Sequence, residues 1–199
     1  MRRQQWRPTT RLQRSLTLVV ALALSACASL SEKQCESDDW TAIGRMDGER
    51  GLEASELARH REACAAHGVT PDEARYRAGR DAGLAVFCTP RGGYVAGRRG
   101  DVYREVCPAA GADKFLEAFR RGREVSVVLR DVKELRRSLN ELEAVAITGD
   151  YTPEDRTQLR FRAEELNQRV RMKEWEVERL DRKYARQFDA PDLDWIELR

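Results

Sequence analysis

The chain has 199 residues, of which 35% are charged and only 7% are aromatic. Its 36 basic residues nearly balance 34 acidic ones, so it has no broad positive surface of the kind that binds nucleic acid. This composition favours a thin architecture with a high surface area over a thick globular core.

The first 26 residues have the composition of an export signal. Five arginines and no acidic residue accompany an apolar segment, residues 16–24, that has about half the length of a bilayer crossing. The sequence Leu-Ser-Ala-Cys ends at Cys27 and matches the lipobox, at which bacterial lipoproteins are cleaved and acylated. We expect residues 1–26 to be a lipoprotein signal peptide and Cys27 to carry a membrane-anchoring lipid, palmitate among its acyl chains. A secreted protein cut near Ala26 and an uncleaved anchor are the alternatives.

The residue after Cys27 bears on the destination of the mature chain. Inner-membrane lipoproteins often have aspartate there, whereas this chain has Ala28, so we expect the outer membrane of a Gram-negative bacterium, facing the periplasm. Removal of the five leader arginines leaves 31 basic and 34 acidic residues, a net charge near −3. An acidic domain outside the cytoplasm gives no support for a nucleic-acid partner.

Four further cysteines indicate two disulfides, because the number is even and the domain is small and exported. They are Cys35, Cys64, Cys88 and Cys107. A helix predicted over residues 71–88 would hold Cys64 and Cys88 about 25 Å apart, and a disulfide joins Cα atoms within about 7 Å. We therefore favour the pairs Cys35–Cys64 and Cys88–Cys107.

Residues 27–111 are predicted to form a small helical head that these disulfides staple together. Cap and proline signals place three helices in it. They run through residues 40–43 after a Ser37 or Asp38 cap, over residues 56–66 after Ser55, and over residues 71–88 after Thr70. The glycine-rich residues 89–106 are predicted to be irregular, with a short hairpin or a single helical turn as the options.

An aromatic or apolar residue precedes a glycine at helical spacing several times in the head, as in Tyr76-x2-Gly79. We interpret this pattern as helix packing through small residues, which lets two backbones approach closely and offsets the helix propensity that glycine loses. The alternative is a binding groove for a small molecule or a cell-wall glycan. Four aromatic residues would line that groove: Trp40, Tyr76, Tyr94 and Tyr103.

The head also carries a series of motifs in a defined order. They are Cys35, Asp39-Trp40, Ile43-Gly44, Asp47-Gly48, His60-x3-Cys64, Tyr76-x2-Gly-Arg-x2-Gly-Leu, Cys88-Thr-Pro and Val106-Cys-Pro. This order resembles a family of small Gram-negative lipoproteins with a domain of unknown function, over about residues 27–122. The resemblance implies lipoprotein status and this cysteine framework, and it carries no activity or catalytic residue.

His60, Cys64 and His67 share one face of the second predicted helix. With Cys35 or Cys88 they could ligate zinc, and a histidine beside a cysteine could activate a thiolate. No Cys-x2-Cys spacing supports either chemistry. The common hydrolase, metalloprotease and phosphate-loop motifs are also missing from the sequence. We therefore expect no enzyme, metal or cofactor.

A basic turn, Gly97-Arg98-Arg99-Gly100, could hold an anion, although a solvated loop is the favoured interpretation.

From Ala112 the sequence becomes charged and helical, and apolar residues alternate at spacings of three and four. Two such segments joined by a turn at residues 148–151 predict an antiparallel coiled-coil hairpin over residues 112–190. The turn places Val128 opposite Lys173, a polar residue that could set the register. The first seam is Val125, Val128, Val132, Leu135, Leu139, Leu142 and Ala146. The second is Leu159, Ala163, Leu166, Val170, Lys173, Val177, Leu180 and Tyr184.

The C-terminal tail, residues 191–199, is apolar enough that we expect it to dock near Phe115 and Phe119. The expected fold is therefore mainly α, a disulfide-stapled head with a long hairpin. We expect a lipid-anchored, non-enzymatic envelope protein whose hairpin binds a protein partner. Small-molecule or glycan binding by the head is the alternative.

Overall fold

A computed structural model describes residues 29–192, and these form seven helices and no strand, which confirms a mainly α fold. The helices are α2 (Glu32–Glu36), α3 (Trp40–Glu49), α4 (Glu56–Ala65), α5 (Glu73–Phe87), α6 (Pro90–Arg99), α7 (Ala109–Thr148) and α8 (Pro153–Gln187). None of these described helices is long and apolar enough to cross a bilayer. The predicted signal peptide, the predicted lipidation site Cys27 and the apolar tail beyond residue 192 lie outside the described residues.

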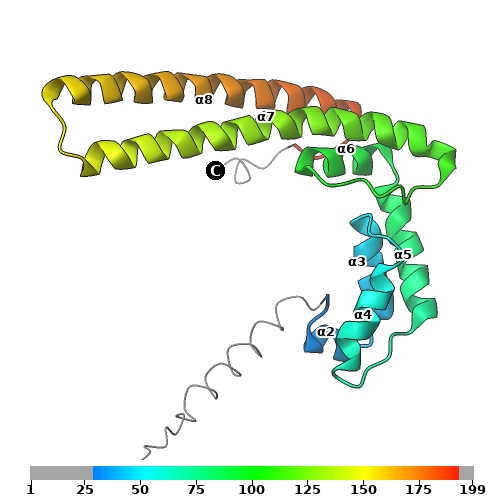
Figure 1. Ribbon diagram of the computed structural model, residues 1–199. Coiled ribbons are helices and arrows are strands. Elements are labelled where there is room, and N and C mark those ends of the chain that lie inside the picture. The colour runs from blue at the N-terminus through cyan, green and yellow to red at the C-terminus, as the bar shows by residue number, and fades with distance from the viewer. Residues whose placement is uncertain (1–28, 193–199) are drawn as a thin grey trace, which may run out of the picture.

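The long hairpin of α7 and α8 dominates the molecule (Figure 1). The arms run antiparallel, as predicted: the Tyr184 hydroxyl of α8 donates to Glu124 of α7 over 2.7 Å, and Lys173 lies 3.2 Å from Asp131. Lys173 is half-buried and also pairs with Glu176, so it meets charged groups at the edge of the seam. α6 lies against the base of the hairpin, and α3, α4 and α5 extend away from that base (Figure 1).

Local signals account for most helix ends. Ala110 and Gly111 interrupt α7, with Gly111 at φ +97°, so its continuous helix begins at Ala112, where the sequence changes character. α8 begins at a Thr152 cap followed by Pro153. Two predicted caps were wrong, because aspartates placed closer to the helices accept the free N–H groups. Asp39 caps α3 in place of Ser37 or Asp38, and Asp72 caps α5 in place of Thr70.

The prediction of an irregular segment over residues 89–106 was wrong, because α6 occupies residues 90–99. Its start repeats that of α8: the Thr89 hydroxyl accepts from the Gly92 N–H, and Pro90 takes the first helical position. Gly100, at φ +82°, ends the helix in the left-handed conformation. Packing against α7 offsets the low helix propensity of the glycines within α6.

Glycines bring two pairs of helices into close backbone contact. A Cβ atom on Gly79 of α5 would lie 2.0 Å from the Thr41 carbonyl oxygen of α3. A Cβ atom on Gly97 of α6 would lie 2.1 Å from the Phe119 carbonyl oxygen of α7. The structure confirms the small-residue packing that the sequence indicates, with one crossing in the α3–α5 pair and a second in the α6–α7 pair.

Both disulfides have the predicted pairing, and each joins Cα atoms 5.4 Å apart. Cys35–Cys64 lies in the core formed by α2 to α5, while Cys88–Cys107 lies beside Phe87 and Phe115 where the head meets the hairpin. A third core fills the hairpin base between α6, α7 and α8. The base is therefore a three-helix layer.

Candidate functional site

The four aromatic residues expected to line a binding groove are not brought together. Trp40 and Tyr76 lie in the core of α2 to α5, and Tyr94 lies in the core of the hairpin base. Tyr103 packs beside Phe115 at the junction, with ring centroids 4.8 Å apart. The side chains of Trp40, Tyr76 and Tyr94 are fully buried, so they stabilise helix packing.

The residues considered for zinc or thiolate chemistry are engaged otherwise. Cys64 is oxidised in its disulfide with Cys35, so it offers no thiolate. His60 is directed at Asp47, and His67 lies 3.6 Å from Glu32 at the surface. Within residues 29–192 no three His, Cys, Asp or Glu side chains are grouped so as to hold a metal ion.

A buried polar network joins α3, α4 and α5 around His60, which is 2% exposed. Its Nε2 lies 2.7 Å from Asp47 Oδ2, and its Nδ1 lies 2.9 Å from the hydroxyl of Ser29. The Tyr76 hydroxyl donates to the same Asp47 oxygen over 2.7 Å. Burial raises the pKa of Tyr76, and this hydrogen bond raises it further, so the phenol remains a donor.

This group has the composition of a catalytic triad, because the imidazole of His60 lies between the hydroxyl of Ser29 and the carboxylate of Asp47. The ring is reversed relative to the serine protease arrangement, because Nε2 faces the carboxylate and Nδ1 the hydroxyl. The contact between Ser29 and His60 holds the start of the described chain against α4. Sequence reasoning missed this network, since Asp47, His60 and Tyr76 lie in separate motifs and nothing in their spacing indicates that they meet.

A second buried network ties α6 to α8. Arg98 Nη1 lies 2.8 Å from Asp181, and the Tyr94 hydroxyl donates to the same carboxylate. Arg98 also donates to the Pro191 carbonyl oxygen over 2.8 Å. Burial raises the pKa of Tyr94, and the bond to Asp181 adds to the rise.

The basic turn predicted at residues 97–100, for which a solvated loop was favoured over an anion site, is therefore not a turn. It is the end of α6, where Arg98 is a buried ion-pair partner and Arg99 pairs with Asp101.

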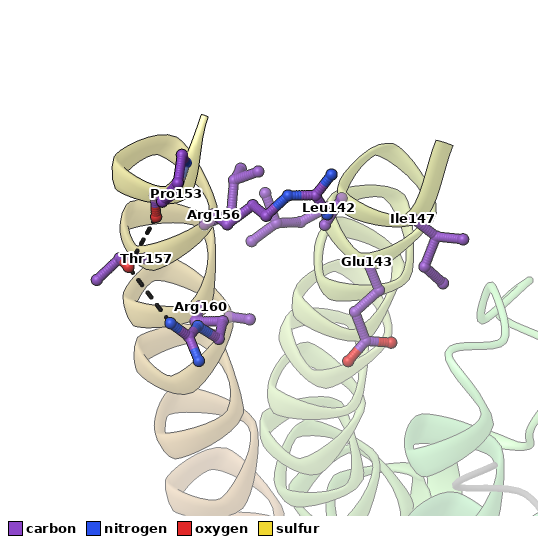
Figure 2. A pocket seen from close by; sticks show the side chains of 10 residues that line it. Leu142, Glu143, Ile147, Pro153, Arg156, Thr157 and Arg160 are labelled. Carbon is purple, nitrogen blue, oxygen red and sulfur yellow. Dashed lines mark hydrogen bonds between the residues drawn. The ribbon is translucent and has the colours of Figure 1, made fainter. Parts of the chain in front are cut away.

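The hairpin changes character between its base and its tip. Leu139 of α7 and Val170 of α8 are the last buried residues toward the tip, and none of residues 140–169 is buried. The space between the arms there is an open groove of about 650 Å³, shown in Figure 2. We call it the tip groove. Its lining residues are Leu142, Glu143, Ala146, Ile147, Pro153, Arg156, Thr157, Leu159, Arg160 and Ala163.

The tip groove is open because only two helices meet there and two seam positions hold alanine, Ala146 and Ala163. Charges of both signs flank it. Glu143 lies on α7, and Arg156 and Arg160 lie on α8 (Figure 2). Between residues 29 and 192 none of these three has an ion-pair partner; Arg156 and Arg160 donate only to Tyr151 O and to the Thr157 hydroxyl.

Two large apolar side chains in this part of the hairpin are exposed. Ile147, which lines the tip groove, is 82% exposed, and Phe161 of α8 is 72% exposed. The seam pattern of the sequence indicated which residues face between the arms, but it gave no sign that they would be left uncovered.

Comparison with known protein families gives a match to part of the chain. Residues 39–124 match the family described as Protein of unknown function (DUF2799). The match begins at the cap of α3 and ends in the base of α7, so it covers both glycine crossings and leaves α8 and the tip groove outside. No curated protein and no solved structure matched the chain.

Proposed function

We propose that the protein is a lipid-anchored, non-enzymatic interaction module of the bacterial envelope, and that its hairpin tip binds a helix of a protein partner. The observation that carries this proposal is the tip groove, whose apolar lining lies uncovered between two arms. An amphipathic helix laid in such a groove buries its own apolar stripe and the exposed seam at once.

The rest of the molecule is consistent with a hairpin that holds its tip away from the head. Three helices and the buried Arg98–Asp181 pair fix the hairpin at its base. Continuous helix from Ala112 to Thr148 extends over about 55 Å, since an α-helix rises about 1.5 Å per residue. The lipobox ending at Cys27 supports anchoring of the chain at a membrane.

Photo-crosslinking in cells tests the interaction. A crosslinking amino acid at Ile147, beside the tip groove, should give a protein adduct. The same amino acid at Val127, an exposed apolar position nearer the base, is the matched control and should give none. The substitution Ala163→Leu, which fills the groove from within, should abolish the Ile147 adduct. Adducts from neither position, or equally from both, would overturn the proposal.

Anchoring is tested separately by the substitution Cys27→Ser. The wild-type chain should incorporate a labelled fatty acid and sediment with membranes, and the variant should do neither. Equal membrane association of the two chains would refute lipidation at Cys27.

A further inference from the structure

We infer that the helices which cover the tip groove come from a second copy of this chain, so that two hairpins join at their tips as a four-helix bundle. This inference rests on the proposed function and names its partner. A two-fold axis between the tips would place α7 of each copy against α8 of the other. Such an interface is self-complementary, because the same patch supplies both sides.

The shape of the tip provides both halves of that contact. Ile147 projects beside the groove and is 82% exposed, and Ala146 and Ala163 leave room within it. In a pair related by two-fold symmetry, the projecting side chain of each copy enters the space above the alanines of the other. Four-helix bundles pack in this manner, with side chains of facing helices inserted between one another.

The charges at the rim favour a second copy over an unrelated partner. Glu143 lies on one arm, and Arg156 and Arg160 lie on the other (Figure 2); none of the three forms an ion pair among the described residues. A rim of one sign would select a partner of opposite charge. Opposite signs on the two arms match a two-fold pair, because Glu143 of each copy then faces Arg160 of the other.

Charge exchange between two copies tests this arrangement. Two differently tagged full-length chains are produced in the same cells and one is isolated through its tag. Wild-type chains should co-isolate. Glu143→Arg paired with itself, and Arg160→Glu paired with itself, should each lose about tenfold or more of that co-isolation, since like charges would face each other twice.

The decisive sample combines the two variants. Glu143→Arg with Arg160→Glu restores both ion pairs, so co-isolation should return to near the wild-type level. The matched controls are Glu141→Arg and Arg162→Glu, exposed charges on the same arms outside the tip groove, which should change nothing. Absence of wild-type pairing, or a mixed sample no better than either variant alone, would overturn the inference.

The mass of the Ile147 adduct separates this inference from the proposed function. An adduct of two identical chains supports both. An adduct with a different protein refutes the second copy and leaves the interaction role standing, whereas no adduct refutes both.

Discussion

The base and the tip of the hairpin share one apolar repeat but differ in what covers it. At the base, seam residues of α7 such as Val125 and Val132 are fully buried in a core that also contains Tyr94 of α6 and Val177 of α8. At the tip, Leu142 and Leu159 occupy equivalent seam positions and are only half-buried, because no third helix is present.

This difference shows that the apolar repeat determines which helix faces meet. Whether those faces are also buried from water depends on a third helix that covers them. Hydrophobic stabilisation grows with the apolar area removed from water. Two helices side by side remove little more than a narrow stripe, and the third helix at the base removes much more. The base therefore provides most of the stability, and the tip keeps apolar area available for association.

The largest effect is expected at the buried ion pair of the base. Asp181→Ala leaves Arg98 charged and without that carboxylate in the core, which should lower the free energy of unfolding by about 3–5 kcal/mol. Urea denaturation followed by circular dichroism measures the change. The matched control is Asp131→Ala, whose half-exposed pair with Lys173 should contribute about 0.5 kcal/mol. Similar losses from both variants would contradict the assigned burial of the Arg98 pair.

A smaller loss is expected from the glycine crossing that holds α6 on the hairpin. Gly97→Ala places a Cβ atom 2.1 Å from the Phe119 carbonyl oxygen, so the helices must separate. The free energy of unfolding should fall by about 2–3 kcal/mol.

Gly68→Ala serves as the control for Gly97→Ala. Gly68 has open space around it but a φ of +71°, so this substitution introduces only backbone strain, about 1 kcal/mol. A Gly97 variant no less stable than the Gly68 variant would show that α6 and α7 are not in close contact.

The sequence was sufficient for the features that rest on local signals and spacing. It predicted the helical fold, both disulfides, the antiparallel hairpin and the close packing through glycine. The helix α6 was missed because its glycines suggested irregular backbone. Two signals could have found it. Thr89-Pro90 repeats the Thr152-Pro153 start, and Gly93 and Gly97 repeat the spacing of Gly79 and Gly83.

The buried networks and the tip groove could not be read from the sequence, because they depend on distant partners. Arg98 and Asp181 are far apart in the chain, and nothing near either residue indicates the other. The four aromatic residues likewise looked equivalent in the sequence, yet the fold distributes them over three cores. The tip seam is exposed because α6 packs on the base of the hairpin and does not reach the tip, and no local sequence pattern indicates how far along the hairpin α6 extends.

Two leucines of α7 give the finest comparison of base and tip. Leu139 is 9% exposed, whereas Leu142, one turn further toward the tip, is half-buried in the groove lining. In dilute protein, Leu139→Ala should lower the free energy of unfolding by about 2 kcal/mol, and Leu142→Ala by about 1 kcal/mol or less, in proportion to the smaller area that it buries.

At higher concentration the wild-type protein should gain stability as tips associate, because binding to the folded state stabilises it. The Leu142 variant should gain less stability with concentration than the wild type, and the Leu139 variant should gain as much. If both variants lost the same free energy of unfolding in dilute protein, the tip seam would be as buried within one chain as the base, and the contrast between base and tip would no longer hold.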